Sequence, residues 1–232
     1  MLIEHINKHM NYQHILTNAE VEEELRLSAL QERPANFSGK ILPFLILQER
    51  TLDTGLNLED AIVLGSIFLE KTEIKGPLNL TRASIKDSFY CGLARIKGDV
   101  ILKSANVKGV VNLMGTKIEG SLDFSGLTLS GFLSLAKIDV KNDVNLKAIR
   151  IIDAYHVGLI VKGDAYLREA IIAGSITFEN SIIEGSLDML KVYIGGACNL
   201  KDAKVANTLV LKDSTIKGKL DLEGTEYKEL IK

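Results

Sequence analysis

The chain has 232 residues, of which 46% are hydrophobic and 25% charged, and its formal net charge is −2. This near-neutral balance indicates neither a nucleic-acid-binding surface nor a strongly acidic one. The first ten residues include His5, Lys8 and His9 and have no apolar centre, so they do not resemble a signal peptide. No segment approaches the eighteen uninterrupted apolar residues of a membrane helix. We therefore expect a cytoplasmic protein.

Residues 1–36 are predicted to form an N-terminal helical cap, because they lack the repeat that fills the rest of the chain. A helix is expected to begin at Asn18, where glutamates occupy the first turn, and to end at Pro34. Its apolar residues are Val21, Leu25, Leu27 and Leu30, and a further amphipathic turn upstream is suggested by Ile3, Ile6 and Met10. The first coil of a solenoid exposes apolar side chains and unpaired strand edges, which such a helix can cover.

Residues 37–228 are predicted to form one β-helix domain, because an eleven-residue unit repeats seventeen times from Pro43. Counted from the unit start as position zero, positions +2, +4, +7 and +9 are apolar or small, and only Arg50 among these sixty-eight residues is charged. Chance placement would put about seventeen charges there, since a quarter of the chain is charged. Most units start with a glycine, namely Gly65, Gly76, Gly98, Gly109, Gly120, Gly131, Gly163, Gly174, Gly185, Gly196 and Gly218.

A spacing of two is the strand period, so each unit contains two short strands with apolar side chains on one face. The glycine, Asn or Asp at the corner is expected to adopt the left-handed or turn conformation that a sharp bend needs. Two units, about 22 residues, close a four-sided coil, and a three-sided coil of about seventeen residues is the competing geometry. The unit that starts at Asp153 has only ten residues, and a missing residue at +5 restores its register.

The run from Lys117 to Ile138, KIEGSLDFSGLTLSGFLSLAKI, and the run ANVKGVVNLMGTKIEGSLDF before it follow the pattern I-x-G-x-L-x-L-x-x-A. In this respect about four-fifths of the chain resembles the bacterial pentapeptide-repeat proteins, in a loosened eleven-residue form. The resemblance implies an all-β fold, a right-handed β-helix (solenoid) that is four-sided with about 22 residues per coil. The chain departs from the strict five-residue repeat, so the activities of the family are not carried over. The filament-forming bactofilins are a weaker second resemblance.

Motifs for catalysis or cofactor binding are absent from the sequence, which contains no Walker loop, dinucleotide fingerprint, G-x-S-x-G elbow or Cys-x-x-Cys pair. His5 and His9 could share a metal on one helix face, but a solvated helix explains them better. His156, in the short unit, is interpreted as a surface residue. Cys91 and Cys198 fall on inward positions roughly 24 Å apart, which no disulfide can bridge. We therefore predict buried thiols and no catalytic, cofactor or metal site.

Outward positions are where a solenoid presents its binding residues. Position +3 of alternate units places Ile46, Phe68 and Tyr90 in one column, which is an unusual apolar ladder for a solvated wall. Either the N-terminal helix covers this ladder or a partner binds it. Other outward pairs are expected to form small apolar patches, or merely to stabilise adjacent coils: Val110 with Phe132, Ile160 with Ile182, and Ile171 with Tyr193.

Residues 229–232 are predicted to form a C-terminal tail that is too short to cover the last coil. We expect this coil to bind a second copy of the chain across a two-fold axis. The candidate residues for self-association are Leu220, Leu222, Tyr227, Leu230 and Ile231.

Three classes of function remain. The favoured one is a non-enzymatic scaffold for protein–protein interaction, which forms a homodimer and whose partner the sequence does not name. The second is a DNA-mimicking inhibitor of a DNA-binding enzyme, a role of some pentapeptide-repeat proteins, but position +3 supplies only Asp123, Asp188 and Asp221 for it. The third is a bactofilin-like polymerising or membrane-apposed structural protein. Binding of nucleic acid is not expected. The small outward apolar patches would suit a membrane surface as well as a protein, but no other residue pattern supports membrane contact.

Overall fold

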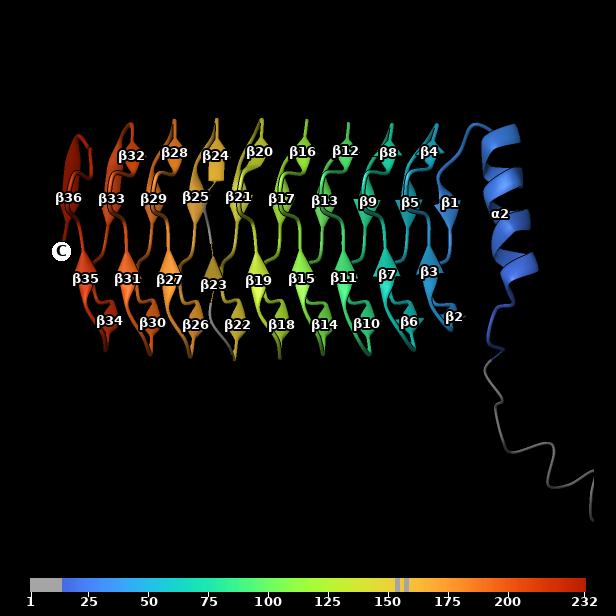
Figure 1. Cartoon of the computed structure of the whole chain (residues 1–232), viewed down its shortest axis with the longest axis horizontal. Helices are drawn as coiled ribbons and strands as arrows, with labels where there is room; N and C mark the ends of the chain where they lie inside the picture. The colour runs from blue at the N-terminus through green and yellow to red at the C-terminus, as the bar shows by residue number, and fades with distance from the viewer. Residues whose placement is uncertain (1–13, 153–154, 157–158) are drawn as a thin grey trace, which may run out of the picture.

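The computed structural model describes residues 14–152, 155–156 and 159–232. The chain winds into a β-solenoid with about 22 residues per turn, and a helix, α2 (Asn18–Leu30), lies across one end (Figure 1). The strands are two or three residues long and stack into four parallel sheets, one on each side of the coil. We number the sheets 1 to 4 in the order in which each turn visits them, so sheet 1 is opposite sheet 3.

Sheet 1 contains β1 (Ala35–Asn36), β5 (Leu56–Asn57), β9 (Leu78–Asn79), β13 (Val100–Ile101), β17 (Leu122–Asp123), β21 (Val144–Asn145), β25 (Ala165–Tyr166), β29 (Leu187–Asp188), β33 (Thr208–Val210) and β36 (Glu229–Ile231). Sheet 2 contains β2 (Ile41–Leu42), β6 (Ile62–Val63), β10 (Ser84–Ile85), β14 (Asn106–Val107), β18 (Thr128–Leu129), β22 (Arg150–Ile151), β26 (Ile171–Ile172), β30 (Tyr193–Ile194) and β34 (Thr215–Ile216).

Sheet 3 contains β3 (Leu45–Ile46), β7 (Ile67–Phe68), β11 (Phe89–Tyr90), β15 (Val111–Asn112), β19 (Leu133–Ser134), β23 (Tyr155–His156), β27 (Ile176–Thr177), β31 (Cys198–Asn199) and β35 (Leu220–Asp221). Sheet 4 contains β4 (Thr51–Leu52), β8 (Glu73–Ile74), β12 (Arg95–Ile96), β16 (Lys117–Ile118), β20 (Ile138–Val140), β24 (Leu159–Val161), β28 (Ile182–Ile183) and β32 (Lys204–Val205).

The strand register confirms the four-sided coil. Leu78 pairs with Val100, 22 residues later, and this separation holds along most of each sheet. The deletion in the unit at Asp153 is also confirmed. Leu133 pairs with Tyr155, 22 residues on, whereas Ile138 pairs with Leu159, 21 residues on. One residue is therefore missing between sheets 3 and 4 in this turn, as predicted.

The solenoid extends by one strand beyond the predicted range 37–228 at each end. At the start, β1 pairs with β5, so residues 35–36 belong to the first turn. At the other end, β36 pairs with β33, so residues 229–231 are a strand of sheet 1 rather than a free tail. Both pairings join residues 21 apart, which a strict eleven-residue count does not follow.

The inward side chains form one continuous core. From the unit at Thr54 to the unit at Gly196, every described residue at +2, +4, +7 and +9 is buried. Arg50, the single charged residue on these positions, lies in the first turn and is exposed. Its guanidinium leaves the core and binds α2, so the exception to the pattern is where the cap attaches.

The left-handed conformation, one of the two expected for the corner glycines, does not occur there. The left-handed conformation occurs at +6, where thirteen non-glycine residues have positive φ, in turns closed by a hydrogen bond from the +7 N–H to the +4 carbonyl. Corner glycines such as Gly98 and Gly131 have no positive φ. A Cβ on Gly98 would lie 2.6 Å from the Pro77 nitrogen of the preceding turn. Glycine is needed there because successive turns approach so closely that no side chain fits.

Helix α2 begins where the sequence predicts. Thr17 is its N-cap in a capping box with Glu20, whose carboxylate accepts from the Thr17 N–H at 2.8 Å. The hydrogen bonds from Thr17 lower the pKa of Glu20 to about 2. Val21 and Leu25 are buried against the first turn, but Leu30 is 69% exposed. The further turn suggested by Ile3, Ile6 and Met10 lies outside the described residues.

Candidate functional site

The predicted apolar ladder exists on the outer face of sheet 3. Ile46 pairs in register with Phe68, and Phe68 pairs with Tyr90. The rings of Phe68 and Tyr90 stack with centroids 5.4 Å apart and planes inclined by 13°. Such stacking holds adjacent turns together, and both side chains remain partly exposed.

Apolar side chains at the corners on both sides of sheet 3 widen this ladder, although exposed charged residues such as Lys86 and Asp87 lie among them. Val110 and Phe132, which the sequence places next to each other, lie at the corner between sheets 2 and 3. The sequence prediction did not include four further exposed residues: Phe44 and Leu64 at that corner, and Leu93 and Met114 at the corner between sheets 3 and 4. We call these nine residues the apolar wall: Phe44, Ile46, Leu64, Phe68, Tyr90, Leu93, Val110, Met114 and Phe132.

The opposite side of the solenoid is polar. On sheet 1 the amides of Asn36, Asn57 and Asn79 form a ladder, in which each Nδ2 donates to the Oδ1 of the preceding turn at 3.2 Å. Further along the same sheet, Asp188 is buried and paired with Arg168. The coil therefore separates an apolar wall from a hydrogen-bonded polar one.

Two predicted partner-binding residues, Ile171 and Tyr193, are not part of this wall. They pair in register on sheet 2, where they are 45% and 40% exposed. Ile160 and Ile182 form an equivalent pair on sheet 4. Since sheets 2 and 4 face opposite directions, these four residues form two separate small patches.

Helix α2 lies across the end of the coil and not along the sheet 3 ladder (Figure 1). It borders only the first rung, where Ile46 remains 50% exposed. Two ion pairs attach the helix. Glu22 binds Arg50 at 2.8 Å, and Glu24 binds Arg33 at 3.0 Å while also accepting from the Asn36 N–H at 2.7 Å. The arginine hydrogen bonds lower the pKa of both glutamates.

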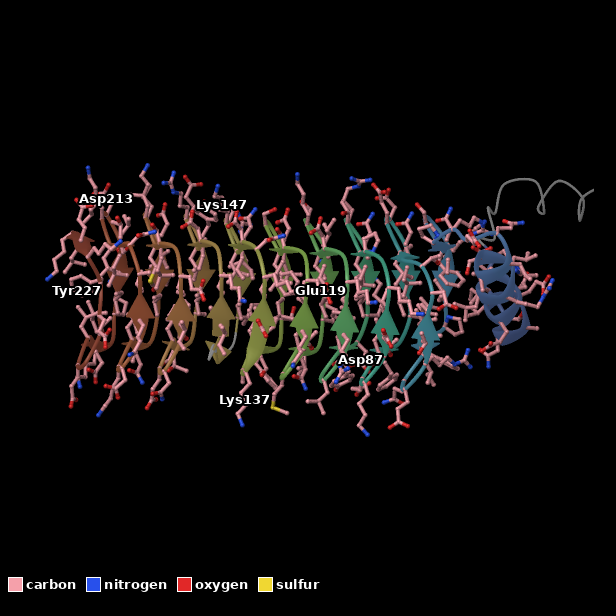
Figure 2. All side chains as sticks on the ribbon, turned by 90° about the horizontal axis from the view of Figure 1, so that it is seen from above. Asp87, Glu119, Lys137, Lys147, Asp213 and Tyr227 are labelled. Atoms are coloured by element: carbon pink, nitrogen blue, oxygen red, sulfur yellow. The ribbon has the colours of Figure 1, made fainter. Side chains whose placement is uncertain are left out.

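The last turn, at the end opposite α2, exposes part of the core. Leu220, Leu222 and Leu230 pack on the core but are only partly buried, whereas Cys198 and Leu200 one turn earlier are fully buried. The aromatic ring of Tyr227 lies at this end of the molecule and is 39% exposed (Figure 2). Ile231 projects outward from β36 and is 36% exposed. All five predicted self-association residues thus gather at one end.

The two cysteine thiols and the Tyr166 hydroxyl have raised pKa values and stay protonated at neutral pH. Burial raises the pKa of the Cys91 thiol above its usual range and that of Cys198 to about 12. On sheet 1, a hydrogen bond of 2.8 Å to Asp164 raises the pKa of the Tyr166 hydroxyl to about 12. Among the described residues, no group of three or more His, Cys, Asp or Glu is arranged to hold a metal ion. His5 and His9 lie outside them.

A DNA mimic requires carboxylates along one face, and the three candidate aspartates do not all lie on the same face. Asp123 and Asp188 lie on sheet 1, and Asp221 lies on sheet 3. Asp188 and Asp221 are paired with Arg168 and Lys219. In the part of the chain that the structure describes, no helix has the length and hydrophobicity needed to cross a membrane.

No protein-family model, curated protein or solved structure matches the chain. The geometry itself defines the class, which is a four-sided β-solenoid with a helix across one end. The likeness to pentapeptide-repeat proteins stays a prediction from the sequence.

Proposed function

We propose that this protein is a non-enzymatic scaffold whose apolar wall binds another protein. One observation carries the proposal: nine large apolar residues gather on one side of the coil, opposite a polar side. Soluble proteins rarely expose an apolar surface that spans several strands unless it is an interaction site. The rigid core places these side chains at fixed spacing, so binding needs little ordering of the wall.

We also propose that the open last turn binds a second copy and gives a homodimer in the cytoplasm. Partly exposed core residues and unpaired strand edges at this end support the proposal. The buried, unpaired thiols of Cys91 and Cys198 suit a reducing compartment.

The wall is tested by affinity capture with the double variant Phe68→Asp and Tyr90→Asp. The matched control is Thr177→Asp with Asn199→Asp, which adds two carboxylates to the same column away from the wall. We expect a captured protein to be lost with the first variant and kept with the second. An identical set of captured proteins for both variants would rule out the wall as the binding site.

Self-association is tested by light scattering at micromolar concentration. We expect a discrete dimer that dissociates when Tyr227→Asp and Ile231→Lys are combined, because both residues are exposed on the open turn. A monomeric wild-type protein would exclude the homodimer, and filaments in electron micrographs would favour a polymerising structural protein instead.

A further inference from the structure

Leu93 is an exception among the turn residues of the solenoid. The non-glycine residues with positive φ are Glu32, Glu49, Asp60, Lys71, Arg82, Leu93, Ser104, Lys137, Ala148, Glu169, Asn180, Lys191, Asp202 and Asp213. Leu93, at φ 59°, is the one large apolar residue in this set. A left-handed conformation is unfavourable for leucine, and a side chain that is 56% exposed recovers little of this cost by burial.

The surroundings of Leu93 keep its side chain at the surface. A Cβ on Gly115 would lie 2.8 Å from Leu93 Cδ2, so glycine leaves space for Leu93 to extend over the next turn. Met114, beside Gly115, is 47% exposed. Leu93 and Met114 therefore present adjoining apolar side chains at the corner between sheets 3 and 4.

Three cations border this corner. Arg95 and Lys117 are exposed on the outer face of sheet 4 and pair in register. Lys137 projects outward from the following turn (Figure 2). Within the described residues none of the three forms an ion pair, although Glu73 and Asp139 lie on the adjacent rungs of sheet 4. Two like charges on neighbouring strands about 4.8 Å apart repel each other, so an anion placed beside them is favoured.

We propose that the partner of the apolar wall is an acidic amphipathic helix, an inference that rests on the proposed scaffold function. Its apolar residues contact Leu93 and Met114, and its carboxylates face Arg95, Lys117 and Lys137. A helix repeats every 5.4 Å and the strands repeat about every 4.8 Å, so a helix along the solenoid axis brings successive turns over successive coils. Charge complementarity selects an acidic helix over a basic one.

The experiment measures fluorescence anisotropy with three labelled synthetic helical peptides. The peptides share one stripe of leucines and carry Glu, Gln or Lys at the positions that flank it. We expect the Glu peptide to bind the full chain at least about tenfold more tightly than the Lys peptide, with binding that weakens as salt is added. The triple variant Arg95→Glu, Lys117→Glu, Lys137→Glu is expected to reverse this preference.

Leu93→Asn separates binding from folding. Asparagine tolerates the left-handed conformation better than leucine does, so we expect an unchanged or higher melting temperature. Loss of the Leu93 side chain should weaken binding of the Glu peptide about tenfold or more. The control is Ile182→Asn, which removes a similarly exposed apolar residue from the other part of sheet 4 and should leave binding unchanged.

Equal binding of the Glu, Gln and Lys peptides would overturn the acidic helix, as would an unchanged affinity of Leu93→Asn. Binding to phosphatidylglycerol vesicles that depends on Leu93, without binding of the Glu peptide, would overturn it in favour of a membrane surface. In either case, capture of a protein that the Phe68→Asp and Tyr90→Asp variant loses would still support the scaffold function. Failure of both experiments would reject both proposals.

Discussion

Gly131→Ala tests why glycine occupies the corners of the coil. A Cβ on Gly131 would lie 2.4 Å from the Gly109 oxygen of the preceding turn, about 1 Å closer than ordinary van der Waals contact. The Gly131 N–H also donates to that oxygen at 3.1 Å, so moving the turns apart strains this hydrogen bond. Overpacking costs about 1–3 kcal/mol, and a weakened hydrogen bond about 1 kcal/mol. Alanine also lowers the conformational entropy of the unfolded chain, which offsets about 0.4–1 kcal/mol of this destabilisation.

We therefore expect Gly131→Ala to lower the free energy of unfolding by about 1–3 kcal/mol. For a chain of this length that corresponds to a fall in melting temperature of roughly 2–12 °C, followed by circular dichroism. The matched control is Gly126→Asn. Gly126 has φ +69°, and a Cβ there would lie no closer than 3.4 Å to atoms of the neighbouring turns, so asparagine should change stability by less than about 0.5 kcal/mol. Equal stability of the two variants would refute close approach as the reason for the corner glycines.

Three further predictions follow from the core and the cap. The Arg33 hydrogen bond lowers the pKa of Glu24 below its ordinary value of 4.5, so its stabilising effect is complete above pH 4.5 and is lost as pH falls through the folded-state pKa. The protection factors of the α2 amides against hydrogen exchange should fall on acidification, and less so in Glu24→Gln. Cys91 and Cys198 should resist a thiol reagent at pH 8 until urea unfolds the chain, and reaction in the native state would contradict their burial. Thr116→Val removes a buried hydroxyl that donates to the Cys91 carbonyl at 2.6 Å, and should cost about 1 kcal/mol in urea denaturation.

The number of sides of the coil and the residues of its core could be predicted because the sequence shows two periods, the two-residue alternation of a strand and the eleven-residue repeat. Strand alternation fixes which residues point inward, and the eleven-residue unit fixes which residues stack. Even the deletion near Tyr155 could be located, since one missing residue moves every later inward position out of phase. The strands at Ala35 and Glu229 were not foreseen, because each is joined to the repeat by a ten-residue unit.

Backbone conformation was harder to predict than register. Residues as different as Lys71, Asp60 and Leu93 share the left-handed turn position, so residue type does not mark it. Leu93 and Met114 were overlooked for a related reason, because they lie in turns, whereas the predicted ladders lie on strands and at the corners beside them. Their signal was present in the sequence: at +5 and +6 the other turns carry mainly polar residues or glycine.

Because paired strands are always a similar number of residues apart, the contacts of this β protein are local in sequence. Each strand pairs with one only 21 or 22 residues away, roughly a tenth of the chain length, which is a ratio typical of fast-folding helical bundles. Other all-β folds must join distant segments before any sheet is complete. Here each new turn can add to the one before it as soon as about 22 residues have emerged from the ribosome, and α2, which precedes the strands in the chain, already closes the end from which growth starts.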